Sequence, residues 1–491
     1  MPPEPTANAS VKKLLPWLVA VAVFMESLDT TILNTAVPAI AEALLVAPLS
    51  MKAVLSSYTL SLAVFIPVSG WMADRYGTRR VFSAAIAVFT IGSVLCGISN
   101  SIHMLVLCRV LQGCGGAMMV PVGRLTMVRT FAKNELIRAM SFVAIPALIG
   151  PMLGPVAGGL MVGFLHWRMI FFINVPIGLL GLYFIYRHLP DYREPRINKI
   201  DITGLILFGA GVALLSYVLE VFGEHTLSGI EMVGLLLLSG VLLSGYWRHA
   251  SAAAHPLLRL NFFRVRTFRA AVVGGFITRL GVGGLPFLLP LLYQLGLGYT
   301  PVQSGFLIMP QALAAMSLKM TMPLLLSRFG YRRVLIYNTV IIGVILGLFA
   351  TIGPATPVWL IVLLAFCFGF FSSLQYTSMN TLVYADVAES DTSMASTIAS
   401  TVQQMSISFG VATASLVAAL FISNGSHSDP PQMIHGVHQA FILLGALTVL
   451  STLVFRELKS TDGDNVAQHS VIATEGSQEI VGATILPPSH P

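Results

Sequence analysis

The sequence contains few charged residues. Asp, Glu, Lys and Arg make up 10% of its 491 residues, whereas an average soluble domain contains about 25%. So few charges could not cover a soluble chain of this length, which excludes the globular domains of about 150 residues each that length alone predicts. Hydrophobic residues make up 55%, and the 43 Gly and 27 Pro residues are tolerated in membrane-spanning helices. The composition therefore predicts a polytopic membrane protein.

Several functional signatures are also missing. The sequence has no Gly-Lys dipeptide, so it lacks the phosphate-binding motif of an ATP-driven pump. Its net charge of +7 is not gathered on a soluble face. Only four cysteines occur, all in apolar runs, and they form neither a disulfide framework nor a C-x-x-C metal site: Cys96, Cys108, Cys114 and Cys367. We therefore expect no enzymatic activity, no cofactor, no bound metal and no nucleic-acid partner.

Long apolar runs dominate the chain. A helix needs about 20 apolar residues to cross the hydrocarbon core of a bilayer, and fourteen runs reach or approach that length. They predict an all-α membrane protein with these transmembrane helices: Leu14–Ala36, Ala53–Met72, Val81–Ile98, Met104–Val122, Phe142–Phe164, Met169–Tyr186, Ile202–Phe222, Met232–Trp247, Ala270–Leu292, Ser304–Leu326, Val334–Ile352, Trp359–Met379, Met394–Phe421 and Val437–Phe455.

The basic residues indicate the sidedness of these helices, because Lys and Arg concentrate on cytoplasmic loops. Of the 28 basic residues, three lie within runs (Arg109, Arg279 and Lys319) and two lie on the opposite side (Lys52 and Arg168). All the others fall on the side of the N-terminus. We therefore expect both termini in the cytoplasm.

A duplicated motif indicates an internal repeat. Residues 74–81 read DRYGTRRV, and residues 327–334 read SRFGYRRV. This predicts two six-helix bundles, with the seventh and eighth runs inserted between two charged linkers. The predicted organisation is a cytoplasmic N-terminus at 1–13, bundles at 14–187 and 269–455, a linker with the two extra helices at 188–268, and a disordered cytoplasmic tail at 456–491.

The first copy of this loop combines an acid with three arginines in a sharp turn. Asp74 can pair with an arginine or accept hydrogen bonds at a helix N-terminus, and glycines permit a close backbone approach. We expect a conformational latch, although an ordinary positively charged loop is the alternative. Its residues are Gly70, Asp74, Arg75, Gly77, Arg79 and Arg80.

The fifth run combines small residues with proline. Glycine at every fourth position lets a second helix approach closely, and two prolines remove backbone donors and bend the helix. Routine helix packing is the alternative, but interleaved Gly-Pro pairs are more specific. The residues concerned are Gly150, Pro151, Gly154, Pro155, Gly158 and Gly159.

Two acids, Glu26 and Asp29, lie three residues apart in the first run and so share a helix face. Burial disfavours the charged form of a carboxyl group, and a neighbouring acid disfavours it further, so such a pair can bind and release a proton. We expect proton coupling here, at Asp29 first. The alternative for Glu26 is that it caps a polar cavity or pairs with Arg109.

Three cations are also expected inside the membrane. Arg109 lies about 10 Å deep in the fourth run, and Gln112 shares its face one turn later. With Arg279 and Lys319 they would line a substrate cavity suited to an anion. The alternatives are that Arg109 is structural and bonds to backbone carbonyls, and that Lys319 extends to the cytoplasmic surface.

These stretches resemble a known family. Residues 74–80, 109–117 and 150–159 are similar to three signature motifs of the major facilitator superfamily. Residues 28–38, LDTTILNTAVP, resemble the first-helix motif of its fourteen-span drug:proton antiporters, the EmrB and QacA type, and the overall pattern is most similar to MdtD-type members. The resemblance covers all fourteen runs.

The resemblance implies roles for individual residues. It assigns proton coupling to Asp29, proton or substrate linkage to Arg109, and an antiport hinge to Gly154, Pro155, Gly158 and Gly159. Two residues depart from the family pattern. Thr78 stands where the latch motif usually has a basic residue, which we expect to loosen the latch, and Glu26 is an additional acid.

Together these features predict a proton-coupled efflux antiporter of the inner membrane that exports drugs or other small molecules by alternating access. Its expected partners are the substrate, protons and the lipid bilayer; a periplasmic adaptor is not readable from the sequence. One alternative is export of a small organic anion or metal–carboxylate complex, which the buried cations favour. Another is a membrane sensor or channel, which would show no proton-dependent accumulation.

Overall fold

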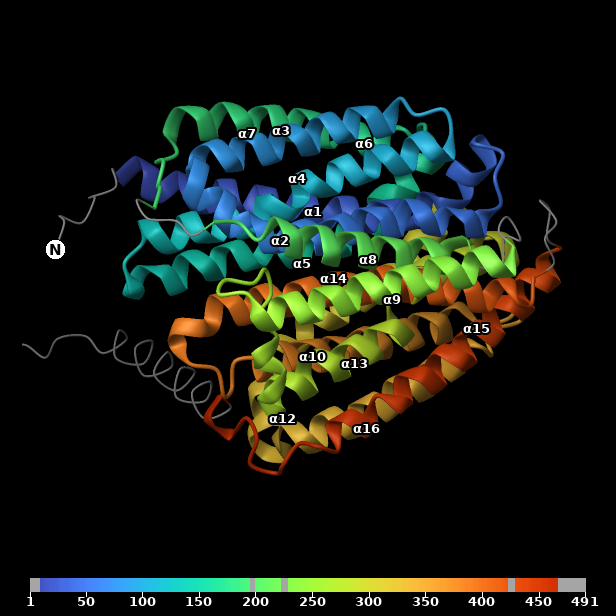
Figure 1. Ribbon diagram of the computed structural model, residues 1–491. Coiled ribbons are helices and arrows are strands. Elements are labelled where there is room, and N and C mark those ends of the chain that lie inside the picture. Colours follow the sequence, from blue (N-terminus) through green and yellow to red (C-terminus); the bar gives the residue numbers. More distant parts are fainter. Residues whose placement is uncertain (1–8, 195–198, 222–227, 423–428, 467–491) are drawn as a thin grey trace, which may run out of the picture.

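The computed structural model describes residues 9–194, 199–221, 228–422 and 429–466, and within these residues it contains helices and no strands (Figure 1). The helices of the first half are α1 (Ala9–Ala43), α2 (Lys52–Tyr76), α3 (Thr78–Gly97), α4 (Ile102–Thr130), α5 (Lys133–Phe164), α6 (Met169–Phe172) and α7 (Asn174–His188). The pair α8 (Ile202–Val221) and α9 (Gly229–Ala252) follows.

The second half contains α10 (Arg266–Val282), α11 (Leu285–Leu291), α12 (Pro301–Phe349), α13 (Val358–Leu382), α14 (Thr392–Ala419), α15 (Pro430–Leu450) and α16 (Thr452–Phe455), with a π-helical turn, η3 (Leu292–Gly296), after α11. Short 3-10 turns are η1 (Pro48–Met51), η2 (Leu260–Arg264) and η4 (Glu389–Asp391). Helix α12 is two helices joined at Gly330, whose φ of 71° is left-handed.

The helices agree with the predicted spans. In the described part of the chain, twelve helical segments are long and apolar enough to cross a membrane. The other two predicted runs, Leu14–Ala36 and Ser304–Leu326, lie within α1 and within the first part of α12. The all-helical architecture predicted from the apolar runs is therefore confirmed.

The two halves meet mainly through two helix pairs, α5 with α12 and α2 with α14, and α1 also contacts α11 and α12. Within the first half α1 packs on α5, and both α2 and α3 pack on α4; in the second half α12 packs on α13 and α10 on α14 and α15. The inserted helix α8 contacts α2, α14 and its partner α9. Figure 1 shows α8 and α9 lying across the boundary between the first half and the second half.

Buried apolar residues are distributed differently at the two ends of the molecule. At the end where α1 finishes, the distal end, one cluster contains residues of both halves, such as Ile40, Phe287 and Val437. At the end where α1 begins, the proximal end, there are two clusters. One of these lies in the first half, and the other lies in the second half and the inserted pair, with Val68 of α2. The halves therefore close on each other at the distal end.

The start of the predicted tail is ordered, which differs from the expectation of disorder from residue 456. Arg266 donates two hydrogen bonds to the Asp462 carboxylate, at 2.8 and 2.6 Å, and Asn465 donates to the Ala385 carbonyl at 2.6 Å. These contacts hold residues 456–466 against the proximal end of the second half. Residues 467–491 lie outside the described part of the chain.

Candidate functional site

Asp29, in the middle of α1, accepts three hydrogen bonds although its side chain is only 1% exposed. Arg109 of α4 donates through Nη1 at 2.5 Å, Gln112 of α4 through Nε2 at 2.8 Å, and Asn174 of α7 through Nδ2 at 3.0 Å. The two amides also donate to the Ser93 hydroxyl of α3. Two helices, α4 and α7, therefore direct three donors at one carboxylate, and one of these donors is a charged guanidinium.

Arg109 is equally buried and makes further contacts. Its Nε donates to the carbonyl of Val54 at 3.4 Å, its Nη1 donates to Gln112 Oε1 at 2.7 Å, and its guanidinium lies 4.2 Å from the centre of the Tyr58 ring. The backbone contact expected of a structural arginine and the ion pair expected of a coupling arginine thus occur together. Loss of either charge would leave the other buried and uncompensated, which is strongly unfavourable.

Glu26 does not join this network. It lies one turn before Asp29, its Oε2 is buried without a hydrogen-bond partner in the described residues, and Arg124 acts on it electrostatically. The predicted alternative of pairing with Arg109 is wrong, because Asp29 occupies the guanidinium at 2.5 Å. The two acids share a helix, but only one lies at the centre of the polar network.

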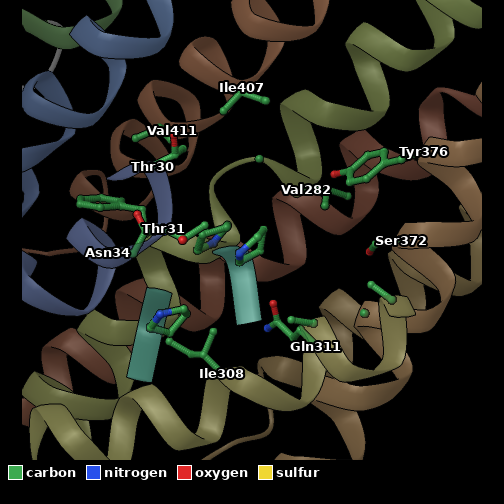
Figure 2. Close-up of a pocket in the computed structure, with 18 of the residues that line it drawn as sticks. Thr30, Thr31, Asn34, Val282, Ile308, Gln311, Ser372, Tyr376, Ile407 and Val411 are labelled. Atoms are coloured by element: carbon green, nitrogen blue, oxygen red, sulfur yellow. The ribbon is translucent and has the colours of Figure 1, made fainter. Parts of the chain in front are cut away.

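A cavity of about 470 Å³ lies between the two halves, next to this network. Figure 2 shows Thr30, Thr31 and Asn34 on one side of it and Ser372 and Tyr376 on the other, with Gln311 between them. Arg109 reaches its wall, as do Pro151 and Pro155 of α5. The cavity is closed toward the distal end by the apolar cluster that both halves share.

The structure places two of the three residues predicted for the cavity, Gln112 and Arg279, outside its lining. Gln112 is fully buried and its amide is bonded to Asp29 and Ser93, so it does not line the cavity. Arg279 lies 4.8 Å from the centre of the Tyr376 ring and donates to Asn380 and Gln403 at 3.4 and 3.5 Å, behind the cavity wall. The side chain of Lys319 lies outside the described part of the structure.

The small residues of α5 make two different contacts. A Cβ at Gly150, Gly154 or Gly158 would meet α1 at 2.0 to 2.6 Å, whereas one at Gly159 would lie 2.4 Å from the carbonyl oxygen of Pro301 in the other half. Thr35 of α1 donates to the Pro155 carbonyl at 3.2 Å. The glycine run therefore joins α1 to α5 and also joins the two halves.

The loop after α2 forms a salt bridge, as its sequence indicated. Asp74 accepts from Arg129 of α4 at 2.7 Å, and Gly77 has a φ of 97° that favours glycine. Arg75 and Arg80 are exposed, and Arg79 contributes its backbone N–H, which donates to Asp191 at 3.2 Å. The role expected for Gly70 in close packing is wrong, because a Cβ there would meet nothing within 4 Å.

Thr78 tightens this loop, contrary to the expectation that it loosens it. The backbone N–H of Thr78 donates to the Tyr192 carbonyl at 3.0 Å, and the N–H of Tyr192 donates to the Thr78 hydroxyl at 3.1 Å. The residue is fully buried. A short side chain lets residues 190–194 lie directly on the turn, where a long basic side chain would have to point away.

The sequence analysis missed several polar residues of the site. Asn174 is the first residue of α7 and lies in a strongly apolar run, and Gln311 and Ser372 are neutral residues in ordinary spans. A search for polar residues inside predicted spans would have found all three. It would not have separated them from the many Ser and Thr residues that bond to their own helix.

Comparison with known proteins identifies similar sequences and folds. Residues 19–411 match the family model of the Major Facilitator Superfamily, and residues 272–478 match it again. The chain is 38% identical over 435 residues to a protein of Serratia proteamaculans, covering 89% of this chain and 90% of that protein. It is 37% identical over 451 residues to one of Escherichia coli, covering 92% and 96%. Both are provisionally named multidrug resistance protein MdtD.

Solved structures show the same fold at low sequence identity. A bacterial homologue of the human lysosomal transporter Spinster, inward-facing and unoccupied, has a TM-score of 0.66 at 15% identity, and the alignment covers 92% of this chain and 98% of that one. The nucleoside transporter NupG has a TM-score of 0.58 at 16% identity, with coverages of 91% and 98%.

Proposed function

Because this chain belongs to the Major Facilitator Superfamily, we propose that it is a multidrug efflux transporter that exchanges outside protons for small molecules from the cytoplasm. The relatives named for multidrug resistance cover nearly its whole length, which supports export of small molecules. The observation that supports proton coupling is the buried Asp29–Arg109 ion pair at the wall of the cavity between the halves.

The geometry suggests how the pair acts. In the conformation described, the distal end is closed and three donors, one of them the Arg109 guanidinium, surround the Asp29 carboxyl group. This is the state expected after a proton has been released. When the distal end opens, protonation of Asp29 removes half of the ion pair, so Arg109 must find new partners in the low-dielectric interior. That rearrangement links proton binding to the relative positions of the halves.

The energy for export comes from the proton. Each proton that moves inward gains about 2.3 kcal/mol per 100 mV of membrane potential, in addition to the pH gradient. We place both termini and the latch loop in the cytoplasm, because the exposed arginines gather at the proximal end. The cavity then faces the cytoplasm in this conformation, and the membrane is the bacterial inner membrane.

Export of an organic anion receives less support from the site. The anion alternative was based on three unpaired cations around the cavity: Arg109, Arg279 and Lys319. Arg109 is paired with Asp29, and Arg279 is stacked on Tyr376 behind the wall. An anion would also be attracted more strongly when Asp29 is protonated, whereas an exchanger must bind its proton and its substrate in alternation.

The test is flux in proteoliposomes under an imposed pH gradient, with wild type and Asp29→Asn. We expect the variant to lose uphill transport by about tenfold or more, because it cannot cycle between charged and neutral forms. It should keep substrate exchange in the absence of a gradient, since exchange needs no net proton movement. Retained exchange also shows that the variant is folded.

Glu42→Gln is the matched control, because this carboxylate lies exposed near the end of the same helix; we expect normal uphill transport. Glu26→Gln separates the two acids of α1 and should reduce transport much less than Asp29→Asn. Uphill transport that survives Asp29→Asn would remove Asp29 from the mechanism. A wild-type protein that moves no solute under a pH gradient would contradict proton-driven export altogether.

A further inference from the structure

We propose that the central cavity selects neutral, largely apolar molecules that carry hydrogen-bond acceptors, and that it discriminates against lipophilic cations. This inference rests on the proposed export function and specifies its substrate class. It follows from two properties of the residues that line the cavity: their charges, and the buried polar atoms that have no partner.

The lining offers no counter-charge for a cation. Among the described residues around the cavity, Arg109 is the only charged one, and there is no Asp or Glu. The carboxylate nearest to Arg109 is Asp29, which is buried behind it and already accepts three hydrogen bonds. A permanent cation would therefore be desolvated without a carboxylate in contact, which is unfavourable.

Most of the lining suits an apolar body. Large hydrophobic side chains from both halves surround the space, including Leu55, Val282, Phe287, Ile308, Phe368 and Val411. A polycarboxylate would have to give up its hydration to these groups. Because Arg279 is not among the described lining residues, a polycarboxylate would not meet a free guanidinium in return.

Three buried polar atoms in this wall lack partners within the described residues: Tyr58 Oη of the first half, and Gln311 Nε2 and Ser372 Oγ of the second half. The two in the second half carry the argument. The Ser372 side chain is almost fully buried, with the residue 6% exposed. An amide NH₂ group donates hydrogen bonds, and a hydroxyl can donate one. Leaving such groups unpaired in a protein interior is costly. Rotation of either side chain toward the cavity would bring its donor to an acceptor on a bound molecule, such as a carbonyl, ester or nitro oxygen.

The two donors are held in place by close packing. A Cβ at Gly369 of α13 would lie 2.1 Å from the Gln311 carbonyl oxygen of α12, so these helices touch beside the donors. Ser372 follows Gly369 by one turn on α13, and Figure 2 shows Ser372 and Gln311 bordering the same space. The amide of Asn34 borders the space from α1 in the other half. A molecule bound to all three would bridge the two halves.

The experiment measures proton-driven uptake into inverted vesicles or proteoliposomes with three probes. These are chloramphenicol, a neutral molecule with amide and nitro oxygens; ethidium, a lipophilic cation; and citrate, a polycarboxylate. We expect the wild type to transport chloramphenicol and to show little transport of the other two. Ser372→Ala and Gln311→Leu should each raise the KM for chloramphenicol by about three- to tenfold, the loss expected for one neutral hydrogen bond.

Ser378→Ala is the matched control. Ser378 is another buried serine of α13 whose hydroxyl has no partner in the described residues, but it does not line the cavity. Ser378→Ala should leave the KM for chloramphenicol unchanged. Preferred transport of ethidium or citrate, or equal KM values for Ser372→Ala and Ser378→Ala, would overturn the substrate class while leaving proton-driven export intact. Absence of transport of every probe by the wild type would instead refute the export function on which the inference rests.

Discussion

The Asp29 carboxylate accepts three hydrogen bonds, all from residues far from it in the sequence. Asp29 receives hydrogen bonds from α4 and α7, residues far away in the chain, whereas Glu26 one turn earlier receives none from described side chains. Both are acids in an apolar helix, and only their tertiary neighbours distinguish them. The difference predicts that Asp29 and Glu26 are not interchangeable in transport.

Thr78→Val tests the loop at residue scale. Valine has a similar shape but no hydroxyl, so the N–H of Tyr192 would lose its acceptor in a buried position. We expect the free energy of unfolding to fall by about 1–3 kcal/mol, measured as a lower melting temperature in detergent. Thr78→Ser keeps the hydroxyl and should retain most of the stability. Equal melting temperatures for Thr78→Val and wild type would show that the contact contributes nothing.

The environment of the Asp201 carboxyl group predicts that the stability of the fold depends on pH. Burial raises the pKa of its carboxyl, but hydrogen bonds from the N–H of Gly204, from His249 and from the N–H of Leu257 outweigh burial, so the pKa lies below its usual 3.8. A carboxylate with a lowered pKa stabilises the fold above its unfolded pKa, and that contribution disappears as the pH falls through the folded value.

We therefore expect Asp201→Asn to lower the melting temperature at neutral pH and to have progressively less effect below about pH 4. The measurement compares the two proteins across the pH range, so that titration of other carboxylates cancels. Asp464, an exposed acid near the chain's described end, is the control site. A difference between Asp201→Asn and wild type that stays constant down to low pH would argue against the carboxylate as the anchor.

At the scale of helices, α5 serves two interfaces with neighbouring glycines. Gly158 faces Ile32 and Thr35 within the first half, whereas Gly159 faces Pro301 of α12 in the second. The reverse contact occurs one turn along α12, where a Cβ at Gly305 would lie 2.4 Å from the Pro155 carbonyl oxygen. Small residues on α5 and on α12 thus let these two helices pack closely at the distal end.

Gly159→Ala should weaken that closure. The added methyl would meet a backbone oxygen at 2.4 Å, which cannot rotate away, so α5 and α12 must separate. We expect the population to shift toward the conformation that is open at the distal end, seen as longer distances between spin labels on α5 and α12 in double electron–electron resonance. Gly240→Ala on α9 is the control, because nothing lies within 4 Å of its added Cβ. Unchanged distances in Gly159→Ala would contradict the proposed contact.

The inserted helix α8 also touches both halves. Glu220 of α8 accepts from the Ser56 hydroxyl of α2 at 2.5 Å, and Ser408 of α14 donates to the Ser56 carbonyl at 3.2 Å. One residue of α2 therefore contacts the inserted pair through its side chain and the second half through its backbone. A movement of α2 relative to α14 would therefore also displace the inserted pair.

In the whole molecule, the two halves divide the polar chemistry between them. The first half contains the ion pair of Asp29 and Arg109, and the second half contributes Gln311 and Ser372 to the cavity. Arg279 has no carboxylate partner among the described residues and interacts with Tyr376 and two amides instead. If protons bind in one half and much of the substrate contact lies in the other, coupling must pass through their common boundary.

Local pattern was sufficient for much of the architecture. Apolar runs of bilayer length predict helices because unsatisfied backbone groups are too costly in lipid, and the repeated loop at 74–81 and 327–334 indicated two related halves. Asp29 and Arg109 stood out as candidates for the same reason, since an ionisable group in an apolar run needs a partner. These inferences require only the residue and its neighbours in the chain.

The tertiary structure alone decided which groups meet. Gln112 donates to Asp29 and does not face the cavity, and Arg279 lies against the Tyr376 ring. Thr78 accepts a hydrogen bond that holds residues 190–194 on the loop after α2. The structure also showed that Gln311 and Ser372 share a wall with Arg109. Periodicity determines the face of a helix on which a side chain lies, but its partner depends on the rotation and depth of a second helix, which long-range packing sets.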